Sequence, residues 1–408
     1  MRGVALALLG FAIAVATAGE SASGVQSPCS RTVVAGAAFS ADSKWVGVAR
    51  QRSCDALSSL LVLRTDGRGR RTLGRTILDW GWAPRGDRLA LEPIQSGLSS
   101  LVVTTTAGKR VLRVADATAF AWSPNGRELA VRRRDPEDIV VAPVSGATRP
   151  VAEAPRGNFL SGQALEWAPD GRSILFTAAG DGPRLSIRAV GEDGTGEHEL
   201  ARGADARWSP EGSRVVYGRP LTGRGGYEWE TARADGSDPR SVGPECGSSA
   251  DWAPQGEWLS FASCTSPCLD CDPVASVAPA DGASLLSIGS GVGYWSPRGN
   301  RLALVASHRG VAVTLVDPDG SRRVSLPFAD RPSASWSPSG GAIVVTGRGR
   351  LYRVKSDGGG KKLIAVGDQP VWSPNGRWIA FVRHRSCGDD LYALRLSPRK
   401  LRRLIRCS

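Results

Sequence analysis

A pentad of the form W-[SA]-P-x-G recurs at nearly even intervals, and it restricts the possible folds more than any other feature of the chain. The eight copies begin at Trp82, Trp122, Trp167, Trp208, Trp252, Trp295, Trp336 and Trp372, and a degenerate copy, FSADS, begins at Phe39. Eight intervals span positions 39 to 372, an average of about 42 residues each. A chain of this kind grows by adding copies of one small unit, so its 408 residues need not form separate domains.

Each copy has the same internal order of strands and turns. A short strand ends in the aromatic residue, and the Pro and Gly of the pentad favour a tight turn. An apolar, β-rich run follows, such as 173–176 or 377–381, and after a variable loop comes a third strand. A polar turn, often Asp-Gly as at 193–194, then leads into a fourth strand.

Four antiparallel strands in about 42 residues are typical of one β-propeller blade. A lone sheet of this size leaves apolar faces uncovered, and stacking against sibling sheets covers them. The sequence therefore predicts an all-β fold, a single β-propeller of nine blades, with eight blades as the alternative. The 50 Gly and 26 Pro suit a chain with many tight turns. The repeated Trp is expected to pack between blades rather than to bind a ligand.

The pentads resemble the WD40-like repeat of the TolB type, which is also found in the propellers of prolyl-oligopeptidase-like enzymes. The resemblance covers the chain from about Phe39 to its C-terminus. It implies the fold, and it leaves the function open because one fold hosts many activities.

The first residues read as a secretory signal. Arg2 is a short basic start, Val4 to Ala16 is apolar, and the sequence 16–18 fits a small-residue cleavage site. The apolar run is shorter than the ~20 residues that span a bilayer. We expect a signal peptide over 1–18, a lead-in over 19–30 and the propeller over 31–408. The mature chain is then periplasmic or extracellular, with no transmembrane segment.

Eight cysteines in an exported chain predict disulfides. Two connectivities fit the positions of the cysteines within the repeat units. The first pairs Cys29–Cys54, Cys246–Cys264, Cys268–Cys271 and Cys387–Cys407. The alternative pairs Cys29 with Cys407 and Cys54 with Cys387.

Catalytic and cofactor motifs are scarce, and no nucleophile elbow or phosphate-binding loop is recognisable. The three His, at 198, 308 and 384, fall in different units, so we expect no catalytic residues, no metal and no cofactor. The most unusual segment is the loop RPLTGRGGYEWE over 219–230. Arginine with rigid aromatic residues is enriched at binding hot spots, so Arg219, Arg224, Tyr227 and Trp229 are candidate binding residues.

A formal net charge of +13 favours anionic partners, although the basic residues are scattered along the sequence. Their densest group is Arg399, Lys400, Arg402, Arg403 and Arg406. The sequence favours an exported, non-catalytic scaffold, expected to be a monomer, that binds a protein or an anionic cell-envelope polymer. No nucleic-acid motif is recognisable. The alternatives are a funnel-site enzyme, such as a polysaccharide lyase or hydrolase, and an orphaned propeller of a peptidase system.

Overall fold

A computed structural model describes residues 31–407, except 53–54, 56, 96–97, 156–163, 180–184, 222–226, 245–246, 264–272, 307–311 and 329–331. Every regular element in these ranges is a β-strand. Across the same ranges no helix has the length and apolarity to cross a membrane. The predicted signal peptide and lead-in lie outside the described residues. The chain divides into two compact units: unit 1 runs to Asp116 and resumes at Ala365, and unit 2 is Ala117–Ile364.

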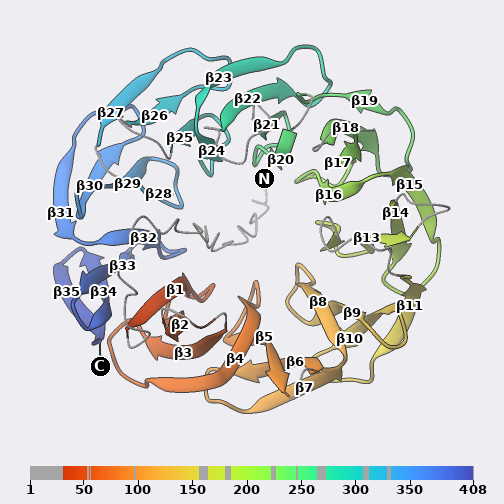
Figure 1. Ribbon diagram of the computed structural model, residues 1–408, viewed down its shortest axis with the longest axis horizontal. Helices are drawn as coiled ribbons and strands as arrows, with labels where there is room; N and C mark the ends of the chain where they lie inside the picture. Colours follow the sequence, from red (N-terminus) through yellow and green to blue (C-terminus); the bar gives the residue numbers. More distant parts are fainter. Residues whose placement is uncertain are drawn as a thin grey trace, which may run out of the picture. The chain divides into compact units, whose positions relative to one another are not determined.

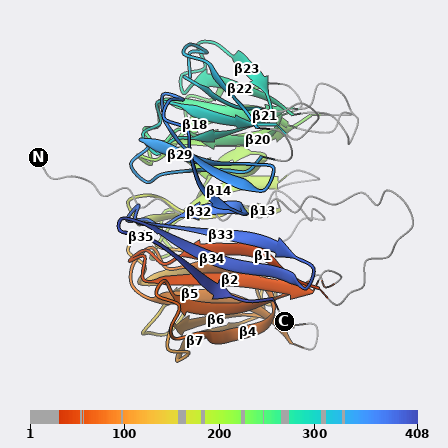
Figure 2. The same cartoon turned by 90° about the vertical axis from the view of Figure 1, so that its left-hand side faces the viewer.

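Unit 1 is built on one continuous sheet that joins both ends of the described chain. Its strands are β1 (Thr32–Phe39), β2 (Trp45–Arg52), β3 (Ser58–Arg64), β4 (Arg71–Trp82), β5 (Arg88–Gln95), β6 (Leu98–Thr105), β7 (Arg110–Ala115), β32 (Asp368–Trp372), β33 (Trp378–Arg385), β34 (Gly388–Leu396) and β35 (Arg399–Ile405). The hydrogen-bonded order is β32-β33-β34-β1-β2-β3-β4-β5-β6-β7, with β35 on the other side of β34. Antiparallel pairing groups these strands into blades β32–β35, β1–β4 and β4–β7 (Figure 2).

The twelve-residue strand β4 belongs to two blades of unit 1. Its first part pairs with β3 and its last part pairs with β5. It is therefore the outermost strand of one blade and the innermost strand of the next.

Unit 2 repeats the four-stranded pattern. Its strands are β8 (Ala117–Trp122), β9 (Glu128–Arg133), β10 (Asp138–Pro143), β11 (Arg149–Glu153), β12 (Leu165–Trp167), β13 (Ser173–Ala179), β14 (Leu185–Gly191), β15 (His198–Arg202), β16 (Ala204–Trp208), β17 (Arg214–Pro220), β18 (Tyr227–Arg233), β19 (Arg240–Ser241), β20 (Gly247–Trp252), β21 (Trp258–Ser263), β22 (Val274–Pro279), β23 (Leu286–Ser290), β24 (Val292–Trp295), β25 (Leu302–Val305), β26 (Ala312–Val316), β27 (Val324–Pro327), β28 (Ala334–Trp336), β29 (Ala342–Gly347), β30 (Arg350–Lys355) and β31 (Lys362–Val366, ending in unit 1). They form four-stranded antiparallel sheets (Figure 1). A bridge between Tyr227 and Gly247 joins the sheet β16–β19 to the sheet β20–β23. Sheets of this kind are typical of propeller blades.

The repeated tryptophan is a hydrogen-bond donor between neighbouring blades. Its indole N–H donates to the backbone carbonyl that precedes the aromatic residue of the previous copy, and its ring packs in the apolar layer. The observed bonds run from Trp82 to Ala38 (3.1 Å), Trp167 to Ala121 (3.1 Å), Trp252 to Arg207 (3.4 Å), Trp295 to Asp251 (3.3 Å) and Trp336 to Tyr294 (3.1 Å). The predicted packing role of the pentad is thus accompanied by a specific polar link.

The second pentad residue is either Ser or Ala, and the turn forms with both. Where it is serine, its buried Oγ accepts the backbone N–H five residues later, as Ser373 does from Trp378 at 2.9 Å. In the alanine copies this turn lacks the hydroxyl, and the backbone bond across it remains, as from Ala168 N–H to the Ser173 carbonyl at 2.8 Å. The pentad glycine takes a positive φ, and in several copies it packs against the previous pentad: a Cβ on Gly212 would lie 3.3 Å from Cδ of Pro169.

Trp208 departs from the pattern and provides a matched control for the indole bond. Its side chain is as buried as that of Trp167, yet its indole nitrogen has no hydrogen-bond partner among the residues that the structure describes. We predict that Trp167→Phe lowers the free energy of unfolding by about 1 kcal/mol more than Trp208→Phe, because only the first change breaks a hydrogen bond. Urea unfolding of both variants measures this difference. Equal losses would show that ring packing alone, and not the indole bond, links the blades.

The first and last blades of the described chain meet within unit 1. Thr32 on β1 forms a parallel bridge with Gly388 on β34, and the N–H of Val34 donates to Oδ2 of Asp389 at 2.9 Å. Asp389 is buried, as are the apolar side chains of both blades that share one core cluster, including Val34 and Leu391. Residues more than 350 positions apart therefore pack as direct neighbours.

At this junction other hydrogen bonds stand in place of the indole bond, which the first copy of the pentad cannot make. Phe39 stands at the tryptophan position and has no N–H to donate. Instead, the N–H of Asn375 donates to Oγ of Ser43 at 3.1 Å, and Nη1 of Arg402 donates to the Asp66 carbonyl at 2.9 Å. The side chains of Ser43 and Arg402 thus provide hydrogen bonds between the two chain ends at a junction that has no indole bond.

His384 makes the stability of this junction dependent on pH. Its Nε2 lies 4.0 Å from Asp368 and its Nδ1 lies 2.8 Å from Asp389, and hydrogen bonds to Asp368 and Asp389 raise the pKa of His384 to about 10. A raised histidine pKa stabilises the fold fully below the unfolded value of ~6.5, and the gain is lost as the pH rises toward 10. We predict that the urea midpoint falls between pH 6.5 and 10, and that His384→Gln reduces this fall. An unchanged slope in the variant would contradict this assignment.

Candidate functional site

Three basic segments lie on the outer strands of the three blades of unit 1. They are 68–75, which enters β4; 109–113, which enters β7; and 399–406, which covers β35. None of the three contains an Asp or Glu. We call them together the basic edge; its basic residues are Arg68, Arg70, Arg71, Arg75, Lys109, Arg110, Arg113, Arg399, Lys400, Arg402, Arg403 and Arg406.

The three segments are contiguous in space although they come from both ends of the chain. The bond from Arg402 to the Asp66 carbonyl joins β35 to the turn that leads into β4. A Cβ on Gly108 would lie 3.1 Å from Cδ of Arg71, so β4 reaches the turn that leads into β7. Strands β35, β4 and β7 accordingly follow one another along the outer side of unit 1 (Figure 1). The C-terminal basic group predicted from the sequence is one part of this larger surface.

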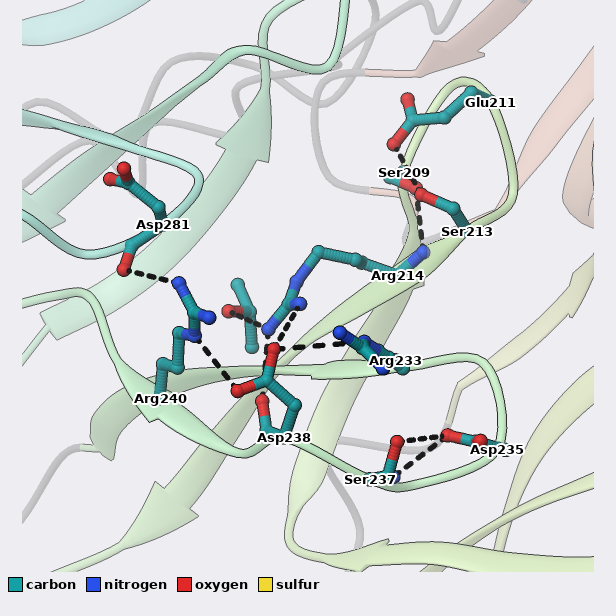
Figure 3. A network of polar contacts seen from close by, with 11 residues as sticks. Ser209, Glu211, Ser213, Arg214, Arg233, Asp235, Ser237, Asp238, Arg240 and Asp281 are labelled. Atoms are coloured by element: carbon teal, nitrogen blue, oxygen red, sulfur yellow. Dashed lines mark hydrogen bonds and ion pairs between the residues drawn. The ribbon is translucent and has the colours of Figure 1, made fainter.

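The arginines of unit 2, in contrast, are widely neutralised by carboxylates. Asp238 receives Nη1 of Arg214 and Nε of Arg240, both at 3.0 Å, and Arg233 lies 3.7 Å away (Figure 3). Arg240 also donates to the Asp281 carbonyl at 3.3 Å and so joins two blades. Other arginines of unit 2 form ion pairs at 3.0 to 3.4 Å, namely Arg149 with Glu128, Arg188 with Glu197 and Arg202 with Glu199.

Few carboxylates neutralise the basic edge. Arg403 approaches Asp390 at 3.8 Å, and it is partly exposed, so solvent screens this pair. Within the described residues, the side chains of Arg70, Arg75, Lys109, Arg110 and Lys400 form no hydrogen bond or ion pair. Their charges therefore remain available to an anion from outside the chain.

A second polar cluster lies on the first strands of neighbouring blades in unit 2. Glu166, Arg207, Asp251 and Tyr294 each precede a pentad tryptophan. Nη1 of Arg207 lies 2.8 Å from Oδ1 of Asp251, and Oε2 of Glu166 accepts the backbone N–H of Trp208 at 3.0 Å. Burial raises the pKa of Glu166 to about 7, and burial also raises the pKa of Asp251 and, with Asp251 nearby, that of Tyr294. These contacts join adjacent blades, as the indole bonds do.

The burial of Glu166 can be tested through the pH dependence of stability. A carboxyl whose pKa is raised by burial destabilises the fold once it ionises, so stability falls between the unfolded value and about pH 7. Glu166→Gln keeps an oxygen that can accept the N–H of Trp208 and removes the ionisation. We predict that the variant loses less stability than the wild type between pH 4.5 and 8, measured as the urea midpoint. A parallel pH dependence of the two proteins would contradict it.

The candidate binding loop is divided between surface and core. Arg219 is exposed and pairs with Glu230 at 2.8 Å and with Glu228, and Tyr227 is half-buried. Trp229 is only 1% exposed and packs in the core. Residues along β18 alternate between the two sides of the sheet. This period of two in the sequence could have predicted that Trp229 is buried. Arg224 lies outside the described residues.

One predicted disulfide is present. Cys387 and Cys407 are bonded, with their Cα atoms 5.7 Å apart, so the end of the chain is tied to the turn between β33 and β34. This pairing belongs to the first of the two predicted schemes. The other six cysteines lie outside the described residues: Cys29, Cys54, Cys246, Cys264, Cys268 and Cys271. The described residues hold no group of three His, Cys, Asp or Glu placed to bind a metal.

No protein-family model matches the chain. Among solved structures, a eukaryotic initiation factor aligns over 92% of this chain and 96% of its own, with 11% identity and a TM-score of 0.60. TolB from Acinetobacter baumannii aligns over 82% and 86%, with 14% identity and a TM-score of 0.38. The β-propeller domain of the Trilobed protease from Pyrococcus furiosus aligns over 79% and 96%, with 15% identity and a TM-score of 0.44. These similarities concern the fold alone.

Proposed function

We propose that this chain is an exported, non-catalytic β-propeller scaffold that binds anionic polymers of the cell envelope along its basic edge. The observation that carries the proposal is the row of cations along the edge of unit 1. Within the described residues, the side chains of Arg70, Arg75, Lys109, Arg110 and Lys400 form no ion pair, whereas many arginines of unit 2, such as Arg149, Arg188 and Arg214, are paired with carboxylates. An extended row of unneutralised cations suits a repeating polyanion, which can engage several of them at once. Binding of this kind releases counterions and is therefore sensitive to salt.

We also propose one nine-bladed ring, secreted through the N-terminal signal and monomeric. Nine pentad copies, the four-stranded grouping of the strands and the pairing of β1 with β34 support it. A closed ring would explain why the two chain ends provide the junction contacts described above. The non-catalytic assignment rests on the scarcity of catalytic motifs in the sequence.

Charge reversal on the basic edge tests the polymer proposal. The edge variant carries Arg70→Glu, Lys109→Glu, Lys400→Glu and Arg406→Glu. The control variant makes the same charge change at exposed positions of unit 2, with Arg127→Glu, Arg172→Glu, Arg298→Glu and Lys362→Glu. Alginate and polyphosphate are the probes, one bearing carboxylates and the other phosphates. We predict that the edge variant binds at least about tenfold more weakly than the wild type, since each cation near an anionic surface contributes ~1 kcal/mol.

Binding is measured by titration at several salt concentrations. The wild type and the control variant should bind, with affinity falling steadily as salt rises. If the control variant weakens as much as the edge variant, net charge and not the basic edge would determine binding. If the wild type binds neither probe at low salt, the proposed function is wrong.

A further inference from the structure

A hollow of about 230 Å³ lies beside the basic edge in unit 1, where β4 crosses from one blade to the next. Residues 73–77 of β4 form one wall. The other walls come from the adjoining blade: Leu91 and Pro93 of β5, Ser100 and Val102 of β6, and Arg110 and Arg113 of β7. The hollow is smaller than the ~300 Å³ at the lower end of drug-sized pockets, so it suits one small group rather than a whole polymer unit.

The path of β4 creates this opening. The register of β4 shifts against β3 and again against β5, and Thr76 takes a positive φ of 54°. The backbone at Gly74 runs close to the next turn of the strand, since a Cβ there would lie 2.6 Å from Cδ1 of Ile77 and would displace that side chain. Oγ1 of Thr76 donates to the Ile94 carbonyl at 3.0 Å and fixes the bend to β5. The backbone is thus held in a bent conformation over the face of the neighbouring blade.

The floor of the hollow is apolar. Ile77, Leu91 and Val102 are at most 8% exposed, and Leu91, Val102 and Arg113 stand opposite one another on β5, β6 and β7. An apolar group placed on this floor would remove apolar surface from water, worth ~25 cal/mol per Å².

The rim of the hollow is cationic. Arg75, Arg110 and Arg113 are exposed, and no side-chain hydrogen bond or ion pair within the described residues engages them. The lining contains no Asp or Glu. A guanidinium presents a planar fork of donors that matches carboxylate and phosphate oxygens, and such bonds are stronger beside an apolar surface than in open water.

We propose that the hollow binds an amphiphilic anion, meaning a carboxylate or phosphate group carried on an apolar chain. Arg110 and Arg113 hold the anionic group, and Ile77, Leu91 and Val102 hold the first part of the chain. An inorganic anion would leave the apolar floor exposed to water, and a neutral chain would leave the three arginines without an anionic partner. The site therefore favours a ligand with both parts. The proposal does not depend on polymer binding, although Arg75, Arg110 and Arg113 also belong to the basic edge.

Calorimetric titration of the full chain with small probes tests the site. Octanoate and octyl phosphate carry both parts, with different anionic groups; octanol carries only the chain, and acetate and inorganic phosphate carry essentially only the anion. We expect at least one amphiphile to bind saturably and at least tenfold more tightly than octanol, acetate or phosphate. The stronger of the two amphiphiles identifies the anionic group. No saturable amphiphile binding, or octanol binding equally tightly, would overturn the proposal.

Variants then locate the site. Arg110→Gln with Arg113→Gln should weaken amphiphile binding by tenfold or more, and Ser100→Phe, which fills the hollow, should abolish it. The matched control, Arg127→Gln with Arg172→Gln, should leave it unchanged. The edge variant, which spares all three rim arginines, should still bind the amphiphile even if it no longer binds polymer. Unchanged binding in the Arg110/Arg113 variant would place the ligand elsewhere and contradict the proposal.

Discussion

A four-stranded sheet of about 42 residues cannot cover both of its apolar faces, so every blade of this protein depends on contact with a sibling. At five junctions the structure meets this requirement with the same pair of interactions, made by Trp82, Trp167, Trp252, Trp295 and Trp336. An indole ring fills the apolar layer, and its N–H donates to a carbonyl of the previous blade. The pentad makes this contact with two parts: the aromatic residue links the blades, and the Pro-Gly turn sets the direction of the next strand.

The junction between the chain ends lacks the pentad tryptophan. Phe39 preserves the apolar part of the contact and lacks the donor. A buried carboxylate, Asp389, accepts a backbone N–H from β1, and the Cys387–Cys407 disulfide holds the last strand close by. Charged and covalent contacts are thus found at the junction that has no indole bond. Because hydrogen bonds to Asp368 and Asp389 raise the pKa of His384 at this junction, we expect its stability to depend on pH.

The sequence predicted the blades well because the signals for them are local. Pentads and Asp-Gly turns fix strand ends within a few residues, and the four-stranded units follow. The basic edge was harder to predict, because its segments at 68–75, 109–113 and 399–406 become neighbours only when β35 packs beside the first blade. The hollow could not be foreseen at all, since it arises from the bend of β4 around Thr76 and not from any motif. Trp229 was given a binding role because aromatic residues beside arginines suggest one, whereas its strand carries it into the core.

Five pentad tryptophans link their blades to the previous ones through the indole N–H. Hydrogen exchange of the indole protons, followed by NMR with each signal assigned by a single Trp→Phe substitution, tests this most directly. We expect slow exchange for the indole protons of Trp82, Trp167, Trp295 and Trp336, each bonded to a carbonyl at 3.1 to 3.3 Å. Fast exchange at these four positions, matching that of a free indole, would contradict it.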